Sequence, residues 1–321
     1  MKDRNSFRGT SIDENFAKSF QKTRFYTDIY KKNKDDIIIG VRDGFINLYY
    51  NCDSIAMISA DNPQQCKIDK YYTSEEKSIL SDDQLVHYFD IIKQNSDKRN
   101  KQEKQAQQRL YIDNNNNPSS DWFCIDVEYT KSLKGKKNPE SWRFDIIAIS
   151  KYPPFRVALI ELKYGSGALK EPSGIRTHVK DFYSFYKNNK FDILKPEIES
   201  IIKSLSVLGV EVPESLKAIS EKQIAPEPEF YFITLNNTPT SKSDNTPKKT
   251  MGGYLFSERD KDKWGTKKVS SLIEKDGDYF DLIEHCKTFK PVFLFSKATL
   301  PNLQIHDILD KKYYDVEVID V

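Results

Sequence analysis

Three residues whose types suit catalysis lie in the two most apolar, strand-like segments of the chain. Asp145 stands within RFDIIAIS, residues 143–150, and Glu161 and Lys163 stand within RVALIELKY, residues 156–164. Ionised groups are costly in segments that are otherwise built for burial, so packing alone does not explain them. We therefore ask whether these charges converge in the fold, because converging carboxylates form a cation site whereas scattered ones do not.

Strand geometry brings the charges together. A proline pair between the two segments predicts an antiparallel hairpin, and its centre places Asp145 opposite Glu161 and Lys163. Side chains alternate along a strand, so Glu161 and Lys163 share one face. The preceding polar loop likewise places Glu128 opposite Asp145, within a register slip of one or two residues. The sequence thus predicts three carboxylates and one ammonium group at one end of an apolar sheet.

Three neighbouring carboxylates repel one another unless a positive charge lies between them. One lysine does not balance three, so we expect a hard divalent cation, Mg²⁺ with Mn²⁺ as its substitute. Such a site suits phosphodiester hydrolysis, because the cation binds the phosphate and lowers the pKa of the attacking water. Lys163 would orient that water or stabilise charge on the phosphate. The alternative is a cross-strand ion pair at the end of the sheet.

Apolar periodicity and turn residues predict two regions. The first, residues 1–95, contains a β-meander at 35–59 with turns at Asp43-Gly44 and Asn51-Cys52-Asp53. The second, residues 96–321, contains a core at 97–237 and a C-terminal extension. The expected core elements are a helix at 97–112, strands at 122–130, 143–150 and 156–164, a helix at 173–190 and a strand at 229–237. Further helices are expected near 81–94, 196–208, 213–222 and 270–288, with a strand at 291–296.

Asp145, an apolar run and then Glu161-Leu162-Lys163 resemble the signature of the PD-(D/E)XK nuclease superfamily, which has the restriction-endonuclease-like fold. The order of helix, three strands, helix and strand over residues 97–237 is similar to the αβββαβ core of that superfamily. The resemblance implies an α/β (α+β) fold, with a mixed central sheet flanked by helices and the β-meander as an N-terminal subdomain. One departure is Phe144, which stands where the family signature has proline.

The resemblance also implies roles for individual residues. Asp145 and Glu161 would bind Mg²⁺, joined by Glu128 and by Glu103 from the first core helix. Other readings stay open for two of these ligands: Glu128 as a solvated carboxylate at a strand end, and Glu103 as an ion-pair partner within its helix.

The helix that follows the E-x-K strand would supply a polar group facing the site. His178 or Lys180 is the candidate on that helix, although His178 also fits a partly buried structural histidine. The polar loop at 238–253 is either a plain surface loop or a basic flap over a polyanion, with Lys242, Lys248 and Lys249 as phosphate contacts.

Composition limits the partners. The formal net charge is only +2, so nucleic-acid binding requires a local basic face. The N-terminus lacks an apolar signal segment and no stretch approaches a membrane span, so a cytoplasmic protein without a membrane partner is expected. The four scattered cysteines form no C-x-x-C pair, which argues against zinc.

These observations together predict a metal-dependent nuclease with DNA as the expected substrate, although the sequence does not decide between DNA and RNA. The alternatives are a non-catalytic nuclease-like scaffold that binds nucleic acid or a protein, and an interaction module carried by the β-meander. Sequence specificity, endo or exo action, and the choice between monomer and homodimer stay open.

Overall fold

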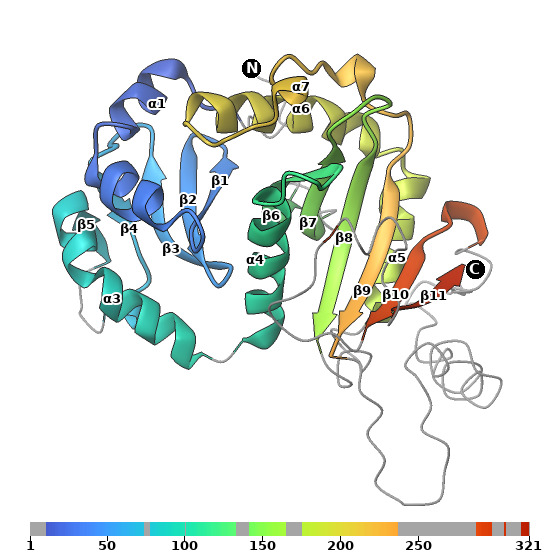
Figure 1. The fold of residues 1–321 in the computed structure, drawn as a ribbon, viewed down its shortest axis with the longest axis horizontal. Helices are drawn as coiled ribbons and strands as arrows, with labels where there is room; N and C mark the ends of the chain where they lie inside the picture. Colours follow the sequence, from blue (N-terminus) through green and yellow to red (C-terminus); the bar gives the residue numbers. More distant parts are fainter. Residues whose placement is uncertain are drawn as a thin grey trace, which may run out of the picture.

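The computed structural model contains two β-sheets joined by helices in one α+β assembly (Figure 1). The structure describes residues 11–73, 78–99, 101–132, 141–164, 175–236, 287–296, 305 and 316–320.

The N-terminal sheet is an antiparallel meander of five strands in sequence order. It confirms the predicted β-meander and extends it by two short strands. Gly44 has a φ of 72° in the first turn, a conformation that glycine adopts without a steric penalty. The strands are β1 (Ile38–Arg42), β2 (Phe45–Tyr50), β3 (Asp53–Ser59), β4 (Gln65–Lys67) and β5 (Ile79–Ser81), and the helices around them are α1 (Glu14–Phe20), α2 (Lys70–Thr73) and α3 (Asp82–Lys98).

The second sheet is mixed, with the spatial order β11-β10-β9-β8-β7-β6. β6 (Trp122–Ser132), β7 (Ser141–Ser150) and β8 (Val157–Tyr164) form an antiparallel meander. β9 (Glu229–Leu235) and β10 (Val292–Ser296) follow in parallel, and β11 (Val316–Asp320) closes the sheet in the antiparallel sense. The helices are α4 (Gln102–Asn115), α5 (Ile175–Lys187), α6 (Phe191–Val207) and α7 (Glu214–Lys217).

Short helical turns complete the described elements. A π-helix spans Phe25–Tyr30, and 3₁₀ turns span Lys31–Asn33 and Glu221–Gln223. The single helix expected near 213–222 is therefore wrong, because α7 ends early and a separate 3₁₀ turn follows it. The helix expected at 270–288 lies almost wholly outside the described residues. No helix in the described part of the chain is long and apolar enough to cross a membrane.

The strand register agrees with the one that the turn centres predict. Ile146 pairs with Ile160 as the last pair of the β7–β8 ladder, so the next positions, Asp145 and Glu161, face each other where the two strands stop pairing. On the other side, the pairs that flank Glu128 place this residue opposite Asp145. A register shift between Cys124 and Asp126 precedes this point in β6.

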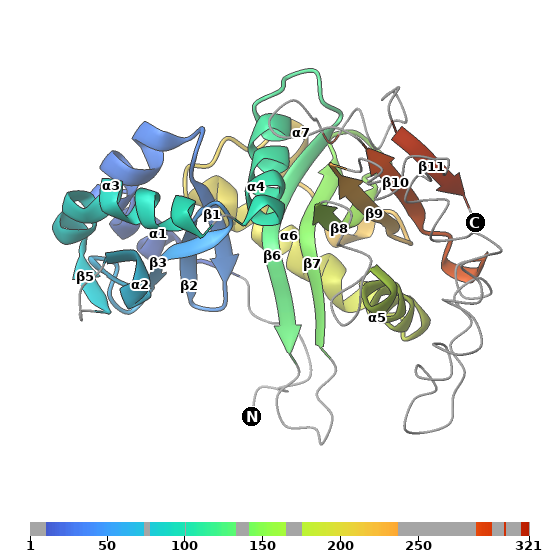
Figure 2. The same ribbon diagram turned by 90° about the horizontal axis from the view of Figure 1, so that it is seen from below.

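Helices cover both faces of the mixed sheet (Figure 2). Ala106 and Leu110 of α4 pack in a cluster with Val127, Ile146 and other residues on one face. Val179 and Phe182 of α5 and Ile198 of α6 belong to the cluster on the opposite face.

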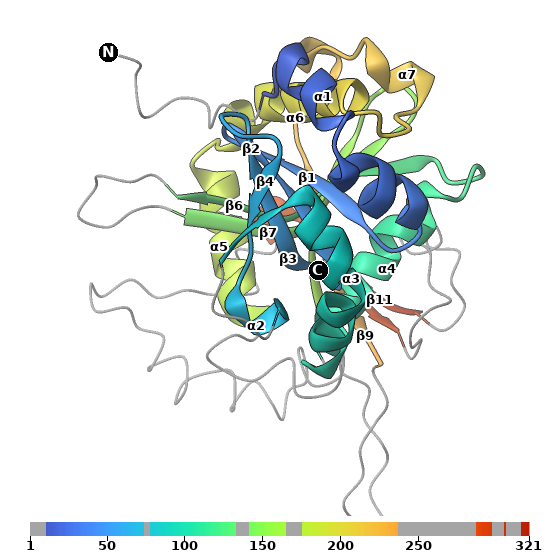
Figure 3. The ribbon, with the colours of Figure 1, turned by 90° about the vertical axis from the view of Figure 1, so that its left-hand side faces the viewer.

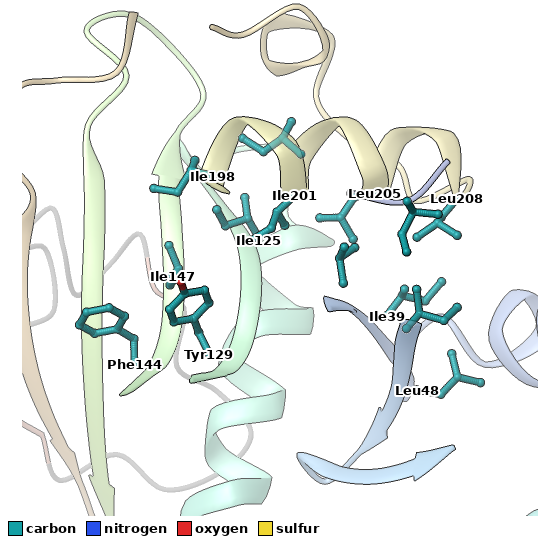
Figure 4. Packing of buried hydrophobic residues seen from close by; sticks show 14 of the residues in the cluster. Ile39, Leu48, Ile125, Tyr129, Phe144, Ile147, Ile198, Ile201, Leu205 and Leu208 are labelled. Atoms are coloured by element: carbon teal, nitrogen blue, oxygen red, sulfur yellow. The ribbon is translucent and has the colours of Figure 1, made fainter. Parts of the chain in front are cut away.

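Helix α6 joins the two sheets into one hydrophobic core. Figure 4 shows Ile198 and Ile201 near residues of the mixed sheet, whereas Leu205 and Leu208 face Ile39 and Leu48 of the N-terminal sheet; all of them belong to the same buried cluster. Figure 3 shows α1 beside α6, where Ile12 N–H donates to Ser204 Oγ at 3.0 Å. The N-terminal region is thus packed into the core rather than tethered to it.

Candidate functional site

The carboxylates that the sequence singles out lie at one edge of the mixed sheet. Glu161 and Lys163 stand near the C-terminal end of β8, and Glu103 stands in the first turn of α4. In Figure 1 the start of α4 and the arrowheads of β8 and β9 lie at the same lower edge. Four elements therefore supply the site: α4, β6, β7 and β8.

Lys163 lies between two of the carboxylates. Its Nζ is 2.6 Å from Glu161 Oε1 and 3.5 Å from Glu103 Oε1. The Lys163 and Glu161 side chains are 8% and 2% exposed, whereas Glu103 is 43% exposed. The reading of Glu103 as a partner within its own helix is wrong, because it pairs with β8. Its predicted role as a metal ligand stays a prediction.

Asp145 is held by the backbone of the neighbouring strand. Its Oδ2 accepts a hydrogen bond of 2.8 Å from Leu162 N–H, where β7 and β8 no longer pair. The Asp145 carboxylate thus accepts the hydrogen bond that a backbone carbonyl of β7 would accept if the two strands continued to pair. This bond fixes the orientation of the carboxylate. Within the described residues no protein group donates a hydrogen bond to its Oδ1, so that oxygen is available to another ligand.

Burial and neighbouring charges shift the pKa values of the side chains in this cluster. Burial raises the pKa of Asp145 to about 7; the Lys163 ammonium and the Leu162 N–H oppose that shift, and Glu128 and Glu103 add to it. Burial also raises the pKa of Glu161 well above its usual range, and the charge on Asp145 adds to that rise while Lys163 opposes it. For Lys163 burial lowers the pKa, but the carboxylates of Glu161, Asp145 and Glu103 outweigh it and raise the pKa overall. Near neutral pH these two buried carboxyl groups therefore tend to hold protons, and a cation bound beside them would favour their ionised forms.

His178 lies beside the same cluster. Its Nε2 is 3.1 Å from Glu161 Oε1, and its side chain is partly buried on α5. The structure places His178 beside Glu161, and its role as a substrate contact or as a structural histidine stays a prediction. Lys180 follows on the same helix, and its contact with a substrate stays a prediction. Lys242, Lys248 and Lys249 lie outside the described residues.

Glu128 occupies the outer side of the cluster. Its φ of 52° is unusual for a non-glycine residue inside a strand, and such outliers gather at functional sites. Its Oε1 is 3.3 Å from Lys104 Nζ, and both side chains are about one third exposed. Glu128 therefore lies opposite Asp145 in the register but is paired with a lysine of α4.

Residues that the sequence did not single out hold α4 in place. Gln107 is buried and donates from Nε2 to the backbone carbonyl of Asp145, which fixes α4 against β7. Its neighbour Gln108 accepts from Cys52 N–H at 2.7 Å and donates to the Asp36 carbonyl, so it anchors the same helix to the N-terminal sheet. Glu103 and Gln107 are one helical turn apart, so they lie on the same face of α4. That spacing is the feature of the sequence that could have indicated that Gln107 faces the site.

The four predicted metal ligands do not form a preassembled chelate. Among the residues that the structure describes, no group of three or more His, Cys, Asp or Glu side chains is arranged to hold a metal ion. The Lys163 ammonium lies between Glu161 and Glu103, and Lys104 engages Glu128. A site built on Asp145 and Glu161 is still consistent with this arrangement, because Mg²⁺ often takes only one or two protein carboxylates together with waters and phosphate oxygens.

Comparisons with known proteins add no relative. No family model, no curated protein and no solved structure matches the chain. The argument for function therefore depends on the geometry and charge of the site.

Proposed function

We propose that this protein is a metal-dependent phosphodiesterase of the PD-(D/E)XK type, a nuclease with Asp145, Glu161 and Lys163 as its catalytic residues. The observation that carries the proposal is that the Lys163 ammonium pairs with Glu161 and Glu103, with Asp145 near enough for its pKa to be affected by Lys163, at the end of an otherwise apolar strand. Support also comes from the element order α4, β6, β7, β8, α5 and β9, with α6, α7 and a 3₁₀ turn inserted before β9, which is similar to the αβββαβ order of restriction-endonuclease-like cores.

The donor set fits Mg²⁺ or Mn²⁺. Both Asp145 and Glu161 supply hard oxygen ligands; burial, and to a smaller extent neighbouring carboxylates, raises their pKa values, and a bound cation would stabilise their ionised forms. A cation bound there would supply Lewis-acid stabilisation of the phosphate and a lowered pKa of the attacking water. Glu103 and Glu128 would serve as outer ligands through water, since both are partly exposed.

The chain's own residues would divide the remaining work. Lys163 Nζ carries a proton, because its pKa is raised, and therefore acts by orienting the water or stabilising charge on the phosphate. The Leu162 N–H fixes Asp145, and Gln107 fixes the strand position that carries it. His178 Nε2 would orient Glu161 or contact the phosphate.

A cleavage assay combined with metal titration tests this proposal. Wild type should cleave single-stranded DNA, duplex DNA or RNA only with Mg²⁺ or Mn²⁺, and Asp145→Asn and Lys163→Ala should abolish it. Calorimetry with Mn²⁺ should show a site that Asp145→Asn weakens strongly and that Lys163→Ala leaves intact. Lys203→Gln on α6, an exposed lysine of the same chain, serves as the matched control that should behave as wild type.

Two outcomes would redirect the assignment. Equal Mn²⁺ binding by wild type and Asp145→Asn would refute the metal site. Metal binding without cleavage of any of the three substrates would favour the non-catalytic nuclease-like scaffold, since such a protein can keep its carboxylates and still lack turnover.

A further inference from the structure

A second charged cluster lies next to the candidate site, where α3 passes into α4. Its centre is Asp53 at the start of β3, which is 4% exposed. Asp53 Oδ1 is 3.3 Å from Arg99 Nη1, 3.4 Å from Lys101 Nζ and 4.0 Å from Lys104 Nζ. Three cations therefore surround one buried carboxylate, whose Oδ2 also accepts from Ser96 Oγ at 3.0 Å.

The cations around Asp53 are partly exposed to solvent and keep N–H donors that could bind a ligand. The Arg99 and Lys101 side chains are 34% and 35% exposed, whereas the carboxylate that they share is buried. Each keeps N–H donors beyond the contact with Asp53, because a guanidinium has five and an ammonium has three. Asp97 is the nearby acid on α3, and it is engaged by Asn51 at 2.8 Å and Tyr50 at 3.1 Å.

An exposed aromatic ring completes this surface. Tyr71 on α2 is 48% exposed, and its ring lies edge-on to Tyr72 with a centroid distance of 5.5 Å. The Arg99 guanidinium lies 5.3 Å from the Tyr71 centroid. Tyr71 is therefore a supported ring at the surface rather than a loose side chain, which is the arrangement on which unpaired nucleobases stack.

Lys104 connects this surface to the candidate site. Its Nζ is 4.0 Å from Asp53 and 3.3 Å from Glu128, which faces Asp145 across the strands. The two clusters are therefore neighbours through Lys104, and in Figure 1 the end of α3 and the start of α4 lie at the same lower edge as the end of β8. A nucleic-acid strand with its scissile phosphate at Asp145 would bring neighbouring phosphates within reach of Lys101 and Arg99.

We propose that Tyr71, Arg99 and Lys101, here called the basic ledge, bind an unpaired segment of nucleic acid next to the scissile phosphate. Arg99 and Lys101 hold its phosphates, and Tyr71 stacks on one of its bases. This inference rests on the proposed function and adds to it a substrate class: a nucleic acid with a single-stranded stretch. Base stacking on Tyr71 requires an unpaired base, which is why the ledge favours single strands over duplex.

Binding without metal tests the ledge separately from cleavage. The probe is a fluorescein-labelled single-stranded oligonucleotide of about 20 nucleotides, titrated in EDTA against Lys163→Ala protein and read by anisotropy. Arg99→Gln with Lys101→Gln should weaken binding at least about tenfold and reduce the salt slope by about one to two. Tyr71→Ala should weaken binding of the single-stranded oligonucleotide by roughly five- to a hundredfold and leave binding of a duplex of the same length unchanged.

Asp53→Asn distinguishes a ligand surface from a purely structural cluster. Removing the central negative charge leaves the three cations less neutralised, so the oligonucleotide should bind more tightly, even though the melting temperature falls. Lys203→Gln is the control and should bind as the Lys163→Ala parent does. The proposal is overturned if the ledge variants bind as the parent does, if Lys203→Gln loses as much affinity, or if a folded Asp53→Asn protein binds more weakly.

The two proposals can fail independently. Ledge-dependent binding without any metal-dependent cleavage would refute the nuclease and keep the ledge. Cleavage that depends on Asp145 and Lys163, with binding indifferent to all three ledge residues, would keep the nuclease and refute the ledge.

Discussion

Two clusters of charged side chains lie close together in the mixed sheet: the Arg42–Asp126 pair and the candidate site around Lys163. They differ in the ratio of positive to negative charge. Arg42 of β1 reaches into the mixed sheet, where its Nη1 donates to both carboxylate oxygens of Asp126 at 2.8 Å. Its Nη2 donates to Tyr49 Oη at 2.9 Å and to the Val127 carbonyl at 2.7 Å. One anion meets one cation, and the guanidinium finds acceptors on several sides.

The candidate site has the opposite balance. Glu161 and Glu103 share the ammonium group of Lys163, Asp145 lies close enough for its pKa to respond to that charge, and burial raises the pKa of both Asp145 and Glu161. A fully matched pair such as Arg42–Asp126, 4% and 0% exposed, belongs to the architecture that joins the two sheets. A cluster with excess carboxylate costs stability, and the proposed cation would offset that cost. Charge balance, more than burial, separates the Arg42–Asp126 cluster from the candidate site.

The largest effect on stability is expected from breaking the Arg42–Asp126 pair. Arg42→Leu leaves Asp126 buried without its cation and should lower the free energy of unfolding by about 3–5 kcal/mol, measured by urea denaturation. The double variant Arg42→Leu with Asp126→Leu should recover most of that loss. A loss below about 1 kcal/mol for the single variant would contradict the structural role of this pair.

The next effect concerns chemistry at the unbalanced cluster. Lys163→Ala should reduce metal-dependent cleavage by about a hundredfold or more, because a positioned electrostatic group is lost. Its affinity for Mn²⁺ should stay the same or rise, since a positive charge next to the cation disappears. Lys163→Arg should not rescue, because the guanidinium is larger and its charge is spread out. Undiminished cleavage by Lys163→Ala would mean that a different group does the chemistry.

A smaller effect concerns stability and pH. The pKa of Asp145 is raised to about 7, so between about pH 4 and pH 7 the folded metal-free protein holds a proton that the unfolded chain releases. Its contribution to stability is therefore present at low pH and is lost as the pH rises through about 7. Asp145→Asn should stabilise the metal-free protein at about pH 8 by on the order of 1–3 kcal/mol and by little at about pH 5.

The matched comparison is Asp126→Asn, which should have the opposite sign because it weakens a balanced pair. Thermal denaturation at both pH values, in EDTA, measures both variants. Destabilisation by Asp145→Asn at the higher pH would show that Asp145 belongs to a structural ion pair after all.

The smallest effect is expected at the rim of the site. Glu128 and Lys104 form a partly exposed pair, so Glu128→Gln should change the free energy of unfolding by less than about 1 kcal/mol. Its Mn²⁺ affinity, measured by calorimetry, should fall by less than about tenfold if Glu128 binds the cation only through water. A loss equal to that of Asp145→Asn would make Glu128 a direct ligand.

The sequence alone determined the three strands of the β6–β7–β8 meander, their register and the carboxylates that meet across them, whereas β4, β5 and β11 were not predicted. Alternation of apolar residues and the turn centres were sufficient because side chains in a strand repeat every two residues and a short hairpin leaves little freedom of register. Asp145 therefore falls opposite Glu161, and Glu128 falls opposite Asp145, as predicted. The β-meander was readable for the same reason.

Only the tertiary structure decided which distant groups complete these local patterns. Sequence periodicity does not reveal the contacts of Gln107, of Arg42 or of the cations around Asp53. Most of their partners lie about 40 or more residues away in the chain. Glu103 is likewise ambiguous in a helix rich in Lys and Gln, until packing of α4 brings it to Lys163. Local geometry is encoded by spacing, whereas charge balance at a site depends on which elements pack together, and that is a property of the whole fold.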